Sequence, residues 1–237
     1  MSVAVLTILK KYHDRYVSGE DISAKLKVSR TAIWKEIQGL RDLGYQIEAF
    51  PHLGYRLTDI PDKLFADEIG YELKTQTIGR KIISYESLDS TNDAVRKFGQ
   101  DGLAEGVCVF AEAQRKGRGR LGRSWLSPRG KGILVSFLLR PPITLGQISG
   151  MTLMVAISAV KAVLTQTGVV LGIKWPNDLI YHDQKVGGIL TEIGAEADRL
   201  NFAVVGLGLN ANGAACDLPK GSISLREIAG KEIARVE

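Results

Sequence analysis

A glycine-rich basic stretch near the middle of the chain carries the residue types best suited to chemistry. Residues 114–125 read Gln-Arg-Lys-Gly-Arg-Gly-Arg-Leu-Gly-Arg-Ser-Trp. The cations of this stretch are Arg115, Lys116, Arg118, Arg120 and Arg123, and its glycines are Gly117, Gly119 and Gly122. Glycine lets backbone N–H groups approach a ligand closely, and guanidinium groups bind phosphate or carboxylate in a forked geometry. We therefore expect this stretch to form a loop that binds an anion.

Two generic nucleotide motifs nearly match the basic stretch, and both fail on context. Gly117, Gly119 and Gly122 fit the dinucleotide pattern G-x-G-x-x-G, which requires a strand before it and a helix directly after it. A strand is expected at residues 107–113, but turn-rich residues follow the stretch. Residues 117–124 resemble a P-loop, but Arg123 stands where the lysine belongs and no helix follows. A flexible nucleic-acid-binding or solvated basic segment remains open as the alternative.

The residues Ser90, Thr91 and Asn92 stand where a helix is expected to begin and to run to about residue 98. The first N–H groups of a helix are unpaired and carry partial positive charge, so this turn could hold a polar ligand. The three residues are equally well explained as helix caps, with Ser90 or Thr91 in the capping position.

Lys185 precedes Gly187 and Gly188 at the head of an expected strand. The two glycines would let a ligand lie against that strand. A lysine at a buried sheet edge needs an anionic partner, because an unpaired buried ammonium group is very costly. A solvated turn lysine is the alternative.

Bulk composition indicates an ordinary soluble chain. Of 237 residues, 45% are hydrophobic and 24% are charged, which suits one or two domains with a good core. We expect neither a signal peptide nor an apolar run of membrane-spanning length, and so predict a cytoplasmic protein without membrane contact. The net charge of +5 permits nucleic-acid binding without establishing it.

Cys108 and Cys216 are far apart in the sequence, with no C-x-x-C pattern and no Cys/His cluster. We expect two buried thiols rather than a disulfide or a metal site. The three histidines are scattered, and neither G-x-S-x-G nor H-E-x-x-H occurs in the sequence.

Residues 1–60 are predicted to form a separate unit of three helices and a hairpin. Apolar residues at helical spacing from Val5 to Tyr16 predict a first helix that Gly19 ends. A second helix is expected over residues 22–28, and a third from the N-cap Ser29 to about residue 43, with Gly44 as its stop. Residues 45–57 show two alternating runs around a turn, which indicates a hairpin. This order resembles a winged helix-turn-helix.

The third helix of this unit would present polar and basic residues on its outer face. We predict that this face binds the major groove of DNA with the hairpin against the backbone, usually as a dimer. The predicted DNA-binding residues are Arg30, Thr31, Trp34, Lys35 and Gln38. A three-helix protein-interaction module is the alternative, but an outward Trp34 among polar residues needs a partner surface.

Residues 61–66 are predicted to be a linker, and residues 67–237 a second domain of mixed strands and helices. Strands are expected at 82–86, 107–113, 132–139, 169–174, 178–181, 185–193 and 201–209, and a mostly apolar helix at 151–166. Strands joined partly by hairpins and partly by helices predict an α+β fold, with a mixed sheet and helices on one face.

Five motifs of this second domain occur in the order seen in biotin protein ligases. They are Ser90-Thr-Asn92, the loop from Gly117 to Trp125, Lys174-Trp-Pro-Asn-Asp178, Lys185-Val-Gly-Gly-Ile-Leu and Gly206-Leu-Gly-Leu-Asn210. With the winged helix in front, the chain resembles the bifunctional bacterial type that also represses biotin synthesis genes. The resemblance implies a catalytic domain like that of class II aminoacyl-tRNA synthetases and biotin ligases.

Family members usually carry a small β-barrel-like domain after the catalytic domain. We expect that domain to be absent here, because the chain stops at Glu237 inside a helix expected from about Ser224. We further expect biotin binding to be retained better than turnover.

The resemblance implies a two-step reaction. Biotin and ATP with Mg²⁺ give biotinyl-5′-AMP, which then acylates one lysine of a biotin carboxyl carrier protein, that of acetyl-CoA carboxylase or another biotin-dependent carboxylase. Such a reaction needs cationic donors for two anionic reactants and no covalent nucleophile. Biotinyl-5′-AMP would also act as corepressor, favouring a homodimer that binds operator DNA.

Roles for individual residues follow from the same resemblance. Biotin would be bound by Ser90, Thr91, Asn92, Gln114, Gly117, Arg118, Gly119, Arg120 and Lys185. The nucleotide would be bound by Arg120, Arg123, Trp125, Asn177, Lys185 and Asn210. The catalytic residues would be Arg118, Arg120, Lys185 and Asp178, and Asp178 is also the candidate for Mg²⁺. The basic loop would become ordered on ligand binding.

Besides nucleic-acid binding by the basic stretch, two alternatives to a biotin ligase remain at this point. One is a biotin-sensing repressor without turnover. The other is a lipoate-type ligase, which the winged helix and the basic loop argue against.

Overall fold

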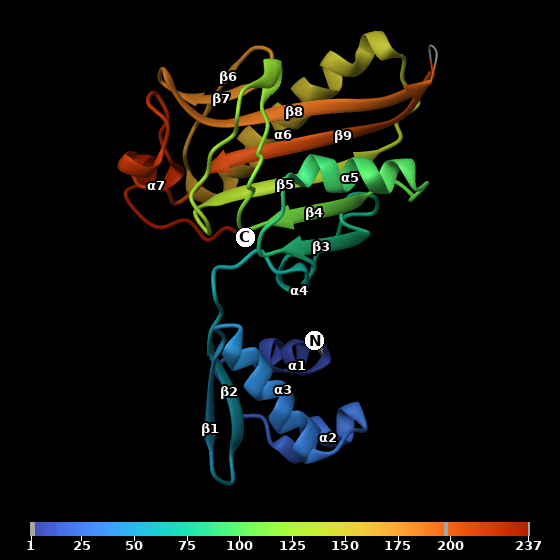
Figure 1. The fold of residues 1–237 in the computed structure, drawn as a ribbon. Coiled ribbons are helices and arrows are strands. Elements are labelled where there is room, and N and C mark those ends of the chain that lie inside the picture. Colours follow the sequence, from blue (N-terminus) through green and yellow to red (C-terminus); the bar gives the residue numbers. More distant parts are fainter. Residues whose placement is uncertain (1–2, 197–198, 237) are drawn as a thin grey trace. The chain divides into compact units, whose positions relative to one another are not determined.

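The structure is a computed structural model that describes residues 3–196 and 199–236. The chain divides into two compact units that meet between Asp62 and Lys63 (Figure 1). Each unit is described by itself. Met1, where the first expected domain begins, and Glu237, where the second ends, lie outside the described residues.

The first unit contains three helices and one antiparallel hairpin (Figure 1). Its elements are α1 (Val3–Lys11), α2 (Gly19–Leu26), α3 (Arg30–Asp42), β1 (Gln46–Phe50) and β2 (Gly54–Asp59). Serine hydroxyls begin two of the helices, since Ser18 Oγ accepts from the N–H of Glu20 and Ser29 Oγ from that of Ala32. The buried faces of the three helices meet in a common apolar core.

Two details of this unit differ from expectation. Helix α1 ends at Lys11, so Tyr12 and Tyr16 lie outside it although their spacing continues the apolar pattern. Gly19 does not end this helix; it is the first residue of α2. Tyr16 is instead half-buried and donates a hydrogen bond to Glu48 on the hairpin.

The second unit is built on a seven-stranded mixed sheet in the order β3-β4-β5-β9-β8-β7-β6. The β3–β4 pair is parallel and the other pairs are antiparallel. The strands are β3 (Lys81–Tyr85), β4 (Val107–Ala111), β5 (Gly132–Leu139), β6 (Gly172–Lys174), β7 (Asp178–Tyr181), β8 (Gln184–Glu196) and β9 (Arg199–Asn210).

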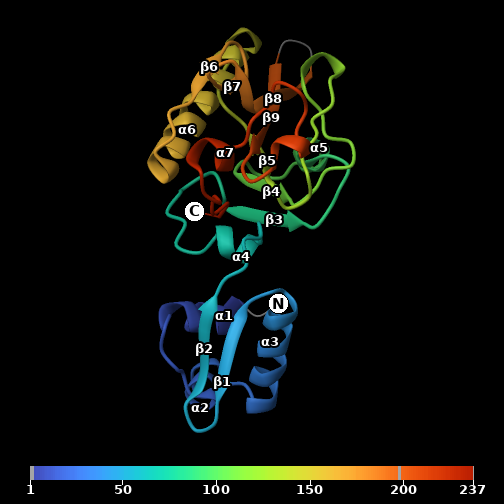
Figure 2. The ribbon, with the colours of Figure 1, turned by 90° about the vertical axis from the view of Figure 1, so that its left-hand side faces the viewer.

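Helices cover both faces of this sheet, whereas we expected them on one face. Along β9, Phe202 and Val204 pack with α5 (Thr91–Gln100), while Ala203 and Val205 pack with α6 (Ile148–Thr167). Figure 2 shows α5 and α6 on opposite sides of the strands. Since successive side chains of a strand point to opposite faces, a strand with apolar residues in both registers is covered on both sides.

Helix α6 corrects the expectation that no apolar run is long enough to span a membrane. Residues 145–167 form one helical stretch with the length and composition of a membrane span. In this unit the stretch is a sheet-packing helix, because Met151, Ala156, Ala159 and Val163 are buried in the core that it shares with β8 and β9. A single helix of this kind is weak support for membrane insertion.

Shorter elements complete the second unit. Helix α4 (Ala66–Ile69) begins at the end of the expected linker, and α7 (Leu225–Ala229) begins with a capping box between Ser224 and Glu227. Three 3-10 turns lie at Arg120–Gly122, Leu145–Gln147 and Ala215–Asp217. The helix expected from about Ser224 is therefore one short helix that ends before Gly230.

The two cysteines differ in exposure. Cys108 is buried on β4, as expected, and burial raises the pKa of its thiol to about 11. Cys216 is exposed in a 3-10 turn, so the expectation that it is buried was wrong.

Candidate functional site

Glycines of β8 and β9 form the floor of a cleft on the α5 side of the sheet. Gly188 pairs with Gly208, and Gly206 lies two residues before Gly208 on β9. A Cβ atom at Gly206 would lie 2.1 Å from Asn92 Oδ1, and one at Gly208 would lie 2.5 Å from the Trp125 ring. The absent side chains therefore let polar and aromatic groups lie directly on the sheet. The cleft has a volume of about 310 Å³.

The first turn of α5 lines one wall of this cleft. Ser90, Thr91 and Asn92 are all buried. Ser90 occupies the N-cap position, but its side chain makes no capping hydrogen bond. Thr91 donates from its backbone N–H to Gln114 Oε1 at 2.7 Å, and its hydroxyl oxygen lies 3.0 Å from the same atom. The side chain of Asn92 reaches across to β8. The explanation of these residues as side-chain caps is therefore wrong.

The basic stretch folds back on itself as a loop over the cleft. The N–H of Trp125 donates to the carbonyl of Gly117 at 2.9 Å, and that of Gly119 to the carbonyl of Arg123 at 2.7 Å. A Cβ atom at Gly117 would lie 2.4 Å from the carbonyl oxygen of Trp125, so this close return requires glycine. Strand β5 follows the loop. This order explains why neither helix-dependent nucleotide motif applies here.

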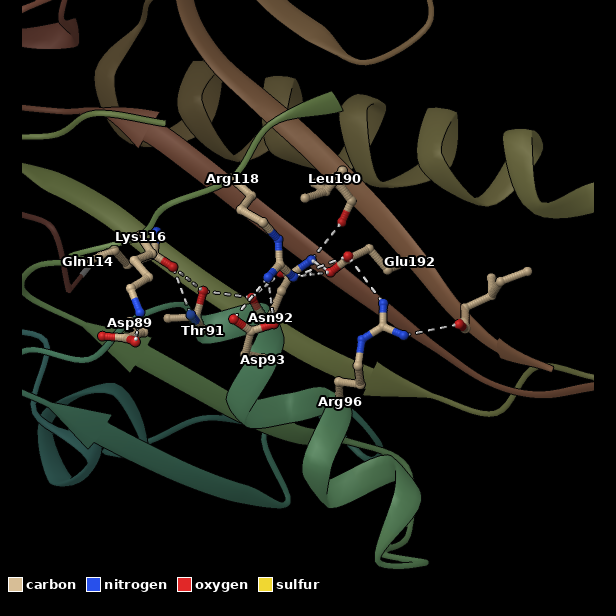
Figure 3. A network of polar contacts seen from close by, with 12 residues as sticks. Asp89, Thr91, Asn92, Asp93, Arg96, Gln114, Lys116, Arg118, Leu190 and Glu192 are labelled. Atoms are coloured by element: carbon tan, nitrogen blue, oxygen red, sulfur yellow. Dashed lines mark hydrogen bonds and ion pairs between the residues drawn. The ribbon is translucent and has the colours of Figure 1, made fainter. Parts of the chain in front are cut away.

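Three cations of the loop are neutralised by carboxylates. Arg115 and Lys116 pair with Asp89 at 2.8 and 2.9 Å. Arg118 lies between two carboxylates, with contacts of 2.7 Å to Asp93 and 3.1 Å to Glu192 (Figure 3).

The remaining two cations of the loop are Arg120 and Arg123, at its tip. Arg120 donates to the side-chain oxygen of Asn177 at 3.3 Å. Within residues 3–196 and 199–236, neither arginine has a carboxylate partner. Both arginines line the cleft, so uncompensated positive charge stands at its mouth. This is the electrostatic feature that favours an anionic ligand.

The ion pairs of Arg118 keep both partners charged. Burial opposes ionisation of Glu192, but the Asn92 amide and the charges of Arg118 and Arg96 hold the pKa of Glu192 below its usual value. Burial also opposes the charge of Arg118, and its contacts with Asp93 and Glu192 raise the pKa of Arg118 above its usual value.

Lys185 lies at the head of β8 with its ammonium group 2.7 Å from Asp178 Oδ1. The group also lies 5.6 Å from the centre of the Trp125 ring. The backbone of Lys185 is hydrogen-bonded to residues 221 and 223 of a distant segment, which fixes where the side chain leaves the strand. Lys185 is thus half-buried and paired, and the alternative of a solvated turn lysine is wrong.

Two asparagines contact the cations of the cleft, Asn177 at Arg120 and Asn210 at the backbone of Lys185. Asn177 accepts from Arg120 and donates to the carbonyl of Ile189 at 3.1 Å. Asn210 is buried behind Lys185 and donates to its carbonyl at 3.4 Å. Asn210 Oδ1 and the indole N–H of Trp125 are buried, and neither has a hydrogen-bond partner among the residues that the structure describes.

Most residues that the sequence singled out for the site line this one cleft. The cleft is lined by Ser90, Thr91, Asn92, Gln114, Arg118, Gly119, Arg120, Arg123, Trp125, Asn177, Asp178 and Lys185. Gly117 and Asn210 lie behind the lining and contact its backbone. Among the described residues that line the cleft, Asp178 is the one with an acidic side chain. One carboxylate suits a Mg²⁺ ion that is bound mainly by phosphate groups rather than by protein ligands.

Sequence reasoning missed Ser136, Asp93 and Glu192. Ser136 is fully buried on β5, 2.5 Å from Asn92 Oδ1 and 2.7 Å from Thr91 Oγ1. Ser136 interrupts the apolar run of β5, and Glu192 interrupts that of β8, and these interruptions could have identified both residues from the sequence. Buried polar groups require partners, so each residue pointed to a polar cluster.

The outer face of α3 is exposed on the first unit. Ile33, Ile37 and Leu40 are buried on its inner side, while the side chain of Trp34 is 54% exposed. The outward residues are Arg30, Thr31, Trp34 and Lys35, with Gln38 half-buried beside them. Arg30 pairs with Glu20 of α2.

Comparison with protein families gives two matches. Residues 84–210 match the biotin/lipoate A/B protein ligase family, and residues 4–56 match a helix-turn-helix (HTH) domain. The first match covers the cleft-forming strands and the basic loop, and the second covers the three helices and most of the hairpin.

The chain is also similar to individual proteins. The chain is 37% identical over 235 residues to the bifunctional ligase/repressor BirA of Bacillus subtilis, covering 98% of this chain and 72% of the relative. It is 34% identical over 194 residues to BirA of Escherichia coli, covering 81% and 59%. A structure of biotin protein ligase from Aquifex aeolicus with biotin and ATP matches with a TM-score of 0.55 and 32% identity, covering 66% and 64%.

Proposed function

The chain belongs to the biotin/lipoate A/B protein ligase family, as a biotin protein ligase with a helix-turn-helix domain, and we propose that it activates biotin with ATP and transfers it to a protein lysine. The observation that carries this proposal is the cleft itself. Its floor is glycine backbone, and Arg120, Arg123 and Lys185 surround it. Such a cleft suits the joining of two anions.

In the first step a biotin carboxylate oxygen attacks the α-phosphorus of ATP, and pyrophosphate leaves. Two negatively charged reactants repel each other, so cations between them lower the barrier. Lys185 would lie between carboxylate and α-phosphate, and Arg120 would bind both groups at the loop tip. Arg118 would join them by exchanging Asp93 or Glu192 for a ligand oxygen, and Gly117 and Gly119 would supply backbone N–H groups.

The other end of biotin carries a ureido ring with two N–H donors and one carbonyl acceptor. Ser90, Thr91, Asn92 and Gln114 offer matching polar groups in the buried wall of the cleft. The nucleotide would stack on Trp125, with Asn177, Asn210 and Arg123 beside it. Asp178 would contribute one carboxylate to Mg²⁺, which supplies charge neutralisation for the triphosphate.

In the second step the amine of a carrier-protein lysine attacks the acyl carbon of biotinyl-5′-AMP. AMP leaves with the bonding electron pair, and the proton that the amine loses passes to water. Asp178 is the acidic residue of the described cleft lining, so it would orient the incoming amine. The acceptor would be the biotin carboxyl carrier protein of acetyl-CoA carboxylase or another biotin-dependent carboxylase.

The first unit extends the proposal to gene regulation. The exposed face of α3 would bind operator DNA, with biotinyl-5′-AMP as corepressor favouring a homodimer. Ordering of the basic loop around the adenylate would couple the two activities. The protein would act in the cytoplasm and away from membranes.

Exchange of labelled pyrophosphate into ATP tests the catalytic proposal. We expect exchange that requires biotin and that lipoate does not support. Lys185→Gln should reduce exchange about 100-fold, because one preorganised charge at the reacting centre is lost. The exposed Lys231→Gln carries the same charge loss and should leave exchange unchanged.

Each other outcome contradicts the proposal in its own way. Exchange with lipoate in place of biotin would identify a lipoate-type ligase. Biotin binding without any exchange would identify a sensor that does not turn over. Equal exchange by Lys185→Gln and the parent would remove Lys185 from the reacting centre.

A further inference from the structure

A continuous chain of hydrogen bonds runs through the buried wall of the cleft and ends at Glu192 (Figure 3). Thr91 Oγ1 lies 2.7 Å from Ser136 Oγ, and Ser136 Oγ lies 2.5 Å from Asn92 Oδ1. Asn92 Nδ2 donates to Glu192 Oε2 at 2.7 Å. At the other end, Thr91 Oγ1 lies 3.0 Å from Gln114 Oε1.

Glu192 is the main determinant of the direction in which this chain donates, because the other acceptor for Asn92 Nδ2, the carbonyl of Leu190, lies at 3.4 Å against 2.7 Å for Glu192. A carboxylate only accepts, so Asn92 must turn its amide nitrogen to Glu192 and its oxygen to Ser136. That oxygen only accepts as well, and Ser136 must therefore give it its single hydroxyl hydrogen. The short contact between Ser136 and Thr91 then takes its hydrogen from Thr91.

With this direction, a hydrogen-bond donor is missing at the end of the chain that faces the cleft. The hydroxyl hydrogen of Thr91 is used toward Ser136, so none lies between Thr91 Oγ1 and Gln114 Oε1. Gln114 Oε1 already accepts from the backbone N–H of Thr91, which keeps the oxygen of this amide facing Thr91. Two acceptors 3.0 Å apart are therefore presented together at the cleft wall. An N–H group of a ligand is the complement of such a pair.

Two guanidinium groups hold Glu192 as a carboxylate. Arg118 of the basic loop and Arg96 of α5 both contact it at 3.1 Å. The charges are only partly exposed, 21% for the Glu192 side chain, so they interact more strongly than a surface pair. The carboxylate of Glu192 on β8 thus connects the basic loop and α5 to this strand.

We propose that Glu192 is a positioning residue that orients the Thr91–Ser136–Asn92 chain so that Thr91 and Gln114 accept an N–H group of the biotin ureido ring. The inference rests on the proposed function, because it assumes biotin in this cleft. Glu192 itself need not touch the ligand. It acts through Asn92 and Ser136, which contact one another across the floor glycine Gly206.

The substitution Glu192→Gln tests this directly. A glutamine can donate to Asn92 Oδ1, which allows every bond of the chain to reverse, so that Thr91 donates to Gln114 and fills the position meant for the ligand. Biotin affinity, measured by titration calorimetry on the ligand-free chain, should fall about tenfold. In pyrophosphate exchange, KM for biotin should rise while KM for ATP and kcat stay within about twofold.

A pair of biotin analogues separates orientation from general damage. In each analogue an oxygen replaces one ureido N–H, which removes a donor and preserves the shape. The parent protein should bind one of the two about tenfold more weakly than biotin. Glu192→Gln should discriminate against it by less than about threefold.

Two further variants complete the design. Ser136→Ala leaves Glu192 and its ion pairs intact but breaks the chain, and it should show the same loss of discrimination. Glu86→Gln removes a carboxylate from an exposed pair with Arg129 and should behave as the parent.

The outcomes distinguish this inference from the function on which it rests. If the parent protein binds no biotin, the proposed function fails. If the parent binds biotin and either Glu192→Gln or Ser136→Ala keeps the full discrimination, the function stands and the role of Glu192 is overturned. Should Glu192→Gln fail to fold, Ser136→Ala alone decides the question.

Discussion

At the scale of single residues, the site depends on two glycines that have no side chain. Gly206 and Gly208 remove side chains from the middle of β9, and the vacated space is filled by Asn92 and by the Trp125 ring. The polar wall can therefore lie against backbone. A small change at either glycine should act on ligand binding more than on the fold.

Gly206→Ala is expected to weaken biotin binding about tenfold or more. Its added methyl group would lie 2.1 Å from Asn92 Oδ1, so the asparagine must move away from Ser136 and Glu192. Titration calorimetry with biotin measures the effect. The matched variant Gly150→Ala meets no atom within 4 Å on α6 and should bind as the parent does. Parent-like binding by Gly206→Ala would show that Asn92 has room to yield.

Site residues differ in how far the sequence could reveal them. The basic loop, the first turn of α5 and Lys185 belong to short local motifs, and the structure brings them to one cleft. Ser136 and Glu192 could not be assigned in the same way. Their partner Asn92 lies 44 and 100 positions away, and only the sheet order brings the three together. Periodicity reports the face of a strand but not the neighbour across the sheet.

At the scale of elements, local signals defined most helices and strands but misjudged what covers them. The apolar spacing continued through Tyr12 and Tyr16, although the backbone leaves the helix at Lys11. Asp14 adopts a positive φ of 66° in this turn, a conformation that spacing does not encode. In β9 the four consecutive apolar residues from 202 to 205 were a signal for two covered faces.

Glu192 also joins three elements, and this should make their association sensitive to acid. Its pKa is lowered from the ordinary value of 4.5 in the folded chain, so folding favours the ionised form. The corresponding stability is fully present above the unfolded pKa and is lost as pH falls through the lower folded pKa. We therefore expect the melting temperature of the parent to fall on acidification through this range.

The substitution Glu192→Gln should make that fall shallower, since the residue no longer titrates. Thermal melts at a series of acidic pH values measure the difference between the two proteins. Glu86→Gln, whose pair is exposed, serves as the control. Parallel curves for the parent and Glu192→Gln would show that the ion pairs with Arg96 and Arg118 do not bear on stability.

At the scale of the whole molecule, two compact units carry different surfaces. One presents the exposed polar face of α3, and the other holds the cleft. Family matches follow the same division, with residues 4–56 in one family and residues 84–210 in the other. The relatives that span nearly all of this chain are described as both ligase and repressor.

If α3 binds DNA, Lys35→Ala should weaken binding across all sequences and reduce the salt dependence of the affinity by about one counterion. Trp34→Ala should weaken it as well, because its 54% exposed ring would be covered in the complex. Fluorescence anisotropy with duplex DNA at several salt concentrations gives the slope. Neither change should alter pyrophosphate exchange.

The exposed Lys220→Ala, in the other unit, carries the same charge loss and is the control for the DNA experiment. An unchanged slope for Lys35→Ala would exclude a phosphate contact by this residue. Equal losses for Lys35→Ala and Lys220→Ala would indicate attraction by net charge alone, without a docking face.

The glycine floor has a consequence for how such a protein can diverge. Every substitution at Gly206 or Gly208 adds side-chain atoms, so mutation at these positions can only reduce the space in the cleft. A relative that binds a different small acid would therefore differ in the side chains of the cleft walls and the basic loop. The glycine backbone beneath them would stay the same.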